Sequence, residues 1–189
     1  MFVYTEAEGN ARGATHHKAK ADDDFSKIVL EEQKNYSGLE DYKAEQLISY
    51  SREIRDKINK KYSEKFIHPY DKSIKNVSHI LWTGKVIDPK SSSRNAVFYG
   101  DKAIDRSPCG TGSSARMAQL FSQNKLKVGE EFVHESYIGS KFNCRVKKTT
   151  KIKEFDGITP VIRGWAKIYG YNKIIVDDDD PFYSGFQVI

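Results

Sequence analysis

Residues 105–117 read Asp-Arg-Ser-Pro-Cys-Gly-Thr-Gly-Ser-Ser-Ala-Arg-Met, and this stretch decides how the rest of the chain is interpreted. Pro108 restricts the backbone just before Cys109, and Gly110 and Gly112 follow it. Glycine permits a tight turn and a close approach of the backbone to a ligand. A helical pattern then begins, so we expect Cys109 at a helix N-terminus. The dipole and the unpaired N–H groups at such an end stabilise a thiolate or a bound carboxylate.

This stretch has other interpretations besides a reactive thiol. Cys109 could be a buried structural residue beside a turn. Residues 110–115 fit the G-x-G-x-x-A dinucleotide pattern, with Glu130 twenty residues beyond Gly110. That motif needs a strand running directly into its first glycine, and here a polar turn intervenes. A cysteine phosphatase loop has five residues between Cys and Arg, whereas six separate Cys109 from Arg116.

Short β-rich runs bounded by Gly, Pro and Ser lie on both sides of the expected helix. They are residues 25–33, 77–84, 94–100, 131–136, 141–146, 160–168 and 172–176. Residues 40–62 carry apolar side chains at helical spacing, with charged residues on the other face. A helix set among many strands predicts an α+β fold with a sheet wrapped around a central helix.

Composition excludes several classes of function. The 189 residues carry a formal net charge of +5, but the lysines are interleaved with acids along the whole chain. This pattern is typical of a solvated surface, so we expect no nucleic acid partner. The sequence holds no run of 18 apolar residues, so we expect no membrane span. His16 and His17 have no third ligand at useful spacing, so we expect no metal site. Two cysteines make no disulfide framework, and a cytoplasmic location is the default.

The motif at 105–118 resembles the second-cysteine motif of the proline racemase family. The similarity continues upstream through residues 79–84 and 94–104, and downstream through 129–142 and 177–186. The 4-hydroxyproline 2-epimerase branch is the most similar. The resemblance implies a diaminopimelate epimerase-like fold, in which two related halves enclose the active site. It makes this chain the C-terminal, second-cysteine half.

The resemblance also implies a domain organisation. We expect an irregular flank at residues 1–24 and the second-cysteine domain at 25–176. The tail at 177–189 is expected to pack on the first half of the fold.

The family inverts an amino-acid Cα with two cysteines, one on each face, and no cofactor. The resemblance makes Cys109 one of these acid/base groups. Asp105 matches the residue that hydrogen-bonds the substrate ammonium, and Gly110 and Thr111 match the positions whose N–H groups bind the carboxylate. His79 stands where hydroxyproline epimerases tend to carry His, and there it would hydrogen-bond the ring hydroxyl.

The first-cysteine motif, usually Met-Cys-Gly-His, does not occur in the sequence. Cys144 lacks its Gly-His neighbours and lies in an expected strand, where a small buried residue is the plain explanation. We therefore expect a fragment that is inactive alone, with 4-hydroxyproline or proline as substrate. A complementing first-cysteine half and a second copy of the chain are its expected protein partners. The alternatives are a proline racemase and a non-catalytic binding module that keeps the fold.

Overall fold

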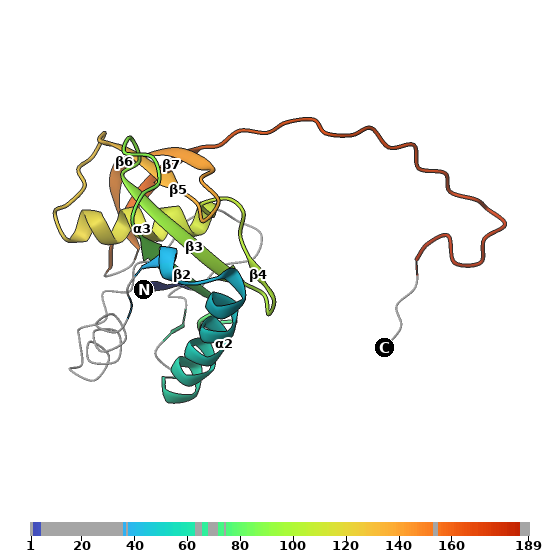
Figure 1. Ribbon diagram of the computed structural model, residues 1–189, viewed down its shortest axis with the longest axis horizontal. Coiled ribbons are helices and arrows are strands. Elements are labelled where there is room, and N and C mark those ends of the chain that lie inside the picture. Colours follow the sequence, from blue (N-terminus) through green and yellow to red (C-terminus); the bar gives the residue numbers. More distant parts are fainter. Residues whose placement is uncertain are drawn as a thin grey trace.

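The computed structural model describes residues 2–4, 36, 38–62, 66–67, 72–73, 75–152 and 155–185. Within these residues the structure has two α-helices and a mixed sheet (Figure 1). In chain order the elements are β1 (Phe2–Tyr4), η1 (Leu39–Asp41), α2 (Ala44–Lys61), β2 (His79–Gly84), β3 (Ser93–Tyr99), β4 (Ala103–Ile104), α3 (Gly110–Ser122), β5 (Glu131–Glu135), β6 (Lys141–Ile152) and β7 (Phe155–Arg163).

The sheet has the strand order β1-β2-β3-β5-β6-β7, with β4 paired to β3. All neighbouring strands are antiparallel except β3 and β5, which run parallel with Ser93 opposite His134. Parallel neighbours need a crossover connection, and α3 lies in the connection between these two strands. The predicted α+β fold with a mixed sheet is confirmed.

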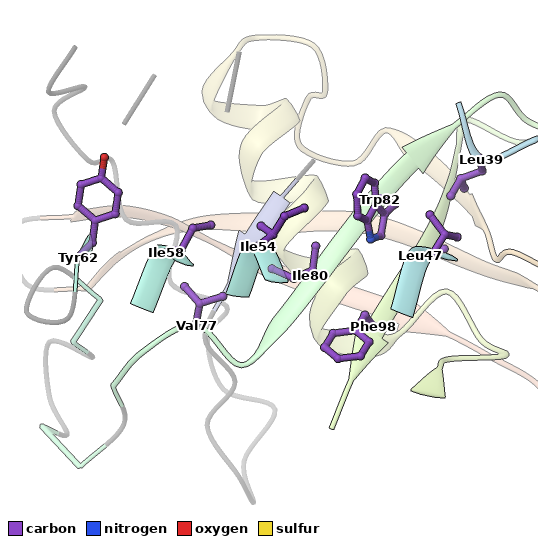
Figure 2. Packing of buried hydrophobic residues seen from close by; sticks show 10 residues of the cluster. Leu39, Leu47, Ile54, Ile58, Tyr62, Val77, Ile80, Trp82 and Phe98 are labelled. Atoms are coloured by element: carbon purple, nitrogen blue, oxygen red, sulfur yellow. The ribbon is translucent and has the colours of Figure 1, made fainter. Parts of the chain in front are cut away.

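The two helices cover opposite faces of β2 and β3. Ile80 and Trp82 belong to a core cluster with α2, as Figure 2 shows, whereas Leu81 packs with Val97 and Cys109 on the α3 side. Alternate residues of a strand point to opposite faces. Both faces of these strands are therefore buried, which explains their nearly continuous apolar sequences.

The rest of the apolar face of α3 packs on the later strands. Met117 and Ala118 form a cluster with Phe132 of β5 and with Cys144 and Val146 of β6. The helix that starts at Cys109 is thus anchored along its length to the sheet.

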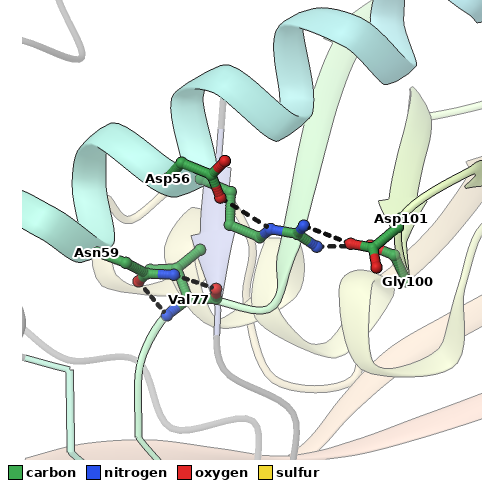
Figure 3. A network of polar contacts seen from close by, with 6 residues as sticks. Asp56, Asn59, Val77, Gly100 and Asp101 are labelled. Atoms are coloured by element: carbon green, nitrogen blue, oxygen red, sulfur yellow. Dashed lines mark hydrogen bonds and ion pairs between the residues drawn. The ribbon is translucent and has the colours of Figure 1, made fainter.

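Polar contacts fix α2 to the loops around β2 and β3 (Figure 3). The side-chain amide of Asn59 donates to the carbonyl of Val77 at 2.9 Å and accepts from its N–H at 2.7 Å. Arg55 hydrogen-bonds the Gly100 carbonyl and pairs with Asp101 at 2.6 Å in the β3–β4 turn. These contacts hold α2 against the segment before β2 and the β3–β4 turn.

A buried hydrogen bond also joins α2 to β2. The indole N–H of Trp82 donates to Oγ of Ser51 at 2.7 Å, and the Ser51 side chain is fully buried. This bond lies on the face of β2 opposite Cys109.

Two sequence expectations differ from the structure. The predicted strand at 160–168 ends at Arg163, and 172–176, also predicted as a strand, forms none. Residues 164–185 instead run away from the sheet as an exposed segment (Figure 1). An extended segment becomes a strand only when a neighbouring strand takes its hydrogen bonds, and no strand pairing is found for this segment among the described residues. Residues 25–33, His16 and His17 lie outside the described residues.

In the part of the chain that the structure describes, no helix has the length and apolar character that a bilayer crossing requires.

Candidate active site

Cys109 is the N-cap residue of α3, which confirms the predicted thiol at a helix N-terminus. Its Sγ accepts a hydrogen bond from the N–H of Gly112 at 3.4 Å and lies 3.3 Å from Oγ1 of Thr111. The side chain is 9% exposed. The thiol therefore takes the place of the Ser or Asp side chain that usually caps the first turn of a helix.

The sequence predicts a tight turn at the glycines that follow Cys109. In the structure the turn falls on Cys109 itself. Cys109 has φ 62° and ψ 125°, whereas neither Gly110 nor Gly112 has a positive φ. Such a conformation costs a non-glycine residue about 1–3 kcal/mol, and it persists only where the surroundings impose it. The glycines are already helical because α3 begins at Gly110.

The two glycines have different surroundings. A Cβ at Gly112 would lie 3.2 Å from side-chain atoms of both Leu81 and Val97, so this glycine lets α3 approach the sheet closely. A Cβ at Gly110 would meet nothing within 4 Å, and Gly110 is exposed. N–H groups in the first turn of a helix have no acceptor within the helix. Gly110 and Thr111 lie in this first turn of α3, the end of a helix that favours anions.

Asp105 is linked to Cys109 through Ser107. Its Oδ1 accepts from the N–H and the Oγ of Ser107, at 2.8 and 2.9 Å, and Ser107 Oγ accepts from the Cys109 N–H at 3.1 Å. The Asp105 backbone N–H donates to the Val97 carbonyl at 2.8 Å, which ties the carboxylate to β3. Asp105 and Cys109 therefore lie at the two ends of one hydrogen-bonded turn.

His79 begins β2, and its Nδ1 lies 2.7 Å from Oγ of Ser78. Alternation along the strand puts His79 on the same face as Leu81, the residue that packs against Cys109. Two strand residues span about 6.6 Å. The structure thus brings His79 to the face of the sheet that carries Cys109.

The sequence interpretation missed a buried polar group beneath Cys109. Asn95, Ser113 and His134 are each fully buried and come from β3, α3 and β5. The sequence held a signal for two of these three residues. Ser113 lies four residues after Cys109, one helical turn on, and His134 alternates with Phe132 on the apolar face of its strand.

Cys144 is the small buried strand residue that its sequence context indicated. It is 3% exposed within the cluster of Phe132 and Val146 on β5 and β6. Burial raises the pKa of the Cys144 thiol to about 12. This thiol is therefore protonated over the whole physiological range.

Comparison with known sequences gives consistent relationships. The sequence profile of the family described as proline racemase matches residues 24–187. A 4-hydroxyproline 2-epimerase from Spirosoma linguale is 56% identical over 161 residues, which cover 85% of this chain and 48% of that protein. The 4-hydroxyproline 2-epimerase 2 of Brucella anthropi is also 56% identical, over 164 residues that cover 85% of this chain and 48% of that protein.

Two crystal structures share the fold. One is a hydroxyproline epimerase from Agrobacterium vitis with bound trans-4-hydroxy-L-proline, with TM-score 0.63 and 29% identity over 77% of this chain and 41% of that one. The other is a probable proline racemase from Agrobacterium radiobacter with bound carbonate, with the same TM-score and identity over 77% and 42%. The chain spans about half the length of the relatives it matches. From the profile match over most of its length and the identity to these relatives, the chain belongs to the proline racemase family.

Proposed function

We propose that this chain supplies one of the two acid/base cysteines of a cofactor-independent epimerase that inverts Cα of 4-hydroxyproline. The observation that carries the proposal is Cys109 at the N-cap of α3, with its Sγ 3.4 Å from the Gly112 nitrogen. A hydrogen bond to the thiolate favours the form that removes a proton. The 56% identity to proteins named 4-hydroxyproline 2-epimerase supports the choice of substrate.

In this proposal the first turn of α3 holds the substrate carboxylate. The N–H groups of Gly110 and Thr111 donate to it, and they bind it more strongly as negative charge develops at Cα. The openness around Gly110 supports this role, because a ligand can come close to the backbone there. Asp105 receives the substrate ammonium, and the hydrogen bond from Ser107 holds the Asp105 carboxylate near the thiol.

The proton transfers then balance without any other reagent. The Cys109 thiolate takes the Cα proton from one face, and an acid on the opposite face delivers a different proton to the same carbon. In the reverse direction the Cys109 thiol is the donor. The opposite acid comes from the portion of the longer enzyme that this chain does not span. Each correctly placed acid or base contributes roughly 100- to 10,000-fold in rate.

The exposed segment that follows β7 supports a partner surface. Its large apolar side chains are all more than half exposed, and they are Trp165, Ile168, Tyr169, Tyr171, Ile174, Ile175, Val176, Phe182 and Tyr183. Contiguous exposed apolar surface is typical of an interaction site. We assign this segment, with the tail at 177–189, to the contact with the other half of the enzyme.

Proline is the second candidate substrate, because the Agrobacterium radiobacter relative is named a probable proline racemase. His79 distinguishes the two. If it binds the ring hydroxyl, His79→Ala lowers kcat/KM for 4-hydroxyproline by about tenfold and leaves proline unaffected, since a lost hydrogen bond to a neutral group is worth about 1–1.5 kcal/mol. Equal losses for both substrates would remove this role.

A chimera tests the proposed function. The matched region of the Spirosoma linguale relative is replaced by this chain, and trans-4-hydroxy-L-proline is assayed by chiral chromatography. Conversion to the cis-D isomer is expected for the chimera and for its Cys144→Ser variant, and is expected to disappear in Cys109→Ser. Conversion that survives in Cys109→Ser contradicts the assignment, and a folded but inactive chimera favours the non-catalytic binding module.

A further inference from the structure

The peptide between Pro108 and Cys109 is held at both ends by side-chain hydrogen bonds. Its carbonyl, on Pro108, accepts from the side-chain amide of Asn95 at 2.9 Å and from Oγ of Ser113 at 3.3 Å. Its N–H, on Cys109, donates to Oγ of Ser107 at 3.1 Å. Rotation of this peptide would break three hydrogen bonds, two of them in the protein interior.

A second layer lies behind Ser113. Oγ of Ser113 is 2.9 Å from Nδ1 of His134, and both side chains are fully buried. The Ser113 hydroxyl has one proton; we assign it to the Pro108 carbonyl, so that Ser113 accepts the proton on Nδ1 of His134. His134 is therefore the Nδ1–H tautomer, and its Nε2 has no hydrogen-bond partner among the described residues.

His134 keeps this role at every physiological pH. Burial, and to a smaller extent the positive charge of Arg116, lowers the pKa of His134 to about 3. The ring is therefore neutral, and it packs against the Phe132 ring, whose centroid is 5.0 Å away. A neutral, oriented donor suits the positioning of a second group and does not suit proton transfer to a substrate.

The arrangement connects the interior to the thiol. Asn95 on β3 and His134 on β5 lie on neighbouring parallel strands, on the face that α3 covers. They fix the Pro108 carbonyl directly and through Ser113. This carbonyl sets the backbone of Cys109, whose left-handed φ of 62° brings Sγ to the Gly112 N–H.

We propose that Ser113 and His134 are positioning residues for Cys109: their hydrogen bond holds the Pro108–Cys109 peptide in the conformation that keeps Sγ on the helix N-terminus. The inference rests on the proposed function, because that function gives the Cys109 thiol its acid/base role. It concerns residues to which the family resemblance gave no role.

The test is the pH profile of Cys109 alkylation by iodoacetamide in the full chain, followed by peptide mapping. Only the thiolate reacts, so the profile reports how well the protein stabilises it. The elements next to Cys109 carry the ionisable residues Asp105 and Arg106 in the loop, His79 on β2 and Arg116 on α3, and all four are the same in every variant.

Three substitutions separate positioning from bulk stability. Ser113→Ala removes the hydroxyl. His134→Gln places its amide donor at the Nε2 position, and His134→Asn places it at the Nδ1 position. We expect Ser113→Ala and His134→Gln to slow Cys109 alkylation about tenfold at neutral pH, because the thiolate loses its fixed place at the helix N-terminus. We expect His134→Asn to stay within about twofold of the wild-type rate.

Ser51→Ala is the matched control, because it also removes one buried hydroxyl that bonds to a ring nitrogen. It is expected to lower Tm without moving the Cys109 profile. Protection of Cys144 from alkylation shows which variants are folded. If Ser113→Ala does not fold, the two His134 variants carry the test, since both keep a neutral amide donor on this side chain.

The proposal is overturned if folded Ser113→Ala or His134→Gln has the wild-type profile, or if His134→Asn behaves like His134→Gln. These outcomes do not depend on substrate. Failure of the proposed function is seen separately, as activity that survives in the Cys109→Ser chimera.

Discussion

The side-chain amide of Asn95 donates a 2.9 Å hydrogen bond to the carbonyl of Pro108, the residue immediately before Cys109. Asn95 is fully buried in the middle of β3, between residues that pack on both helices. The Cys109 loop is therefore attached to the centre of the sheet. In the proposed function this attachment places the thiol before any substrate binds, which is the general requirement for electrostatic stabilisation in a catalytic site.

The two cysteines should differ strongly in reactivity. At pH 7.5 iodoacetamide is expected to label Cys109 at least about a hundredfold faster than Cys144, because only a thiolate reacts. Burial raises the pKa of Cys144 to about 12, whereas Cys109 accepts a hydrogen bond from Gly112 at the end of a helix. Peptide mapping after timed labelling gives both rates. Faster labelling of Cys144 in the folded chain would contradict the assignment of the reactive thiol.

The glycines of the motif offer a matched pair of substitutions. Gly112→Ala places a methyl group 3.2 Å from Leu81 and Val97 and is expected to lower the free energy of unfolding by about 1–2 kcal/mol. Gly110→Ala points into open space and is expected to raise it by about 0.4–1 kcal/mol, since it restricts the unfolded chain. Urea unfolding measures both. Equal effects of the two substitutions would show that α3 does not pack as described.

Neutral His134 should make the fold sensitive to acid. Its pKa is about 3 in the folded chain and near 6.5 when unfolded, so between these values the unfolded state binds one proton more. The contribution of His134 to the free energy of unfolding is complete above pH 6.5. It is lost as pH falls toward 3, by up to about 1.4 kcal/mol per pH unit. From pH 7 to 5 the wild-type chain should lose about 2 kcal/mol more than His134→Asn in urea unfolding. Parallel losses in the two proteins would exclude the buried neutral histidine.

The sequence predicted those elements whose pattern follows directly from burial. The apolar runs at 77–84 and 94–100 became β2 and β3, and the Pro-Cys-Gly sequence marked the start of α3. The positive φ of Cys109 could not be predicted, because the loop imposes it through Asn95 and Ser113 from elsewhere in the fold. Residues 172–176 have strand composition but form no strand, since composition does not supply a pairing partner.

The exposed segment after β7 should cause the isolated chain to associate. Trp165, Tyr169 and Ile174 are 67%, 96% and 84% exposed, and apolar surface of this kind seeks a partner. Light scattering after size exclusion is expected to show concentration-dependent oligomers of the isolated chain. Substitution of residues 174–176 by serine is expected to reduce their amount. Ile87→Ser, which changes a residue 60% exposed outside this segment, is the control. A chain that stays monomeric at high concentration would argue against this segment as a partner surface.

The central claim is that this chain carries one of two acid/base groups, so that Cys109 serves one face of Cα only. The most direct measurement is chiral chromatography of trans-4-hydroxy-L-proline incubated with the isolated chain, beside its Cys109→Ser variant. We predict no conversion to the cis-D isomer by either protein, because inversion requires a donor on the opposite face. Robust conversion by the chain alone, lost in Cys109→Ser, would contradict the account, since it would require a second acid within these 189 residues.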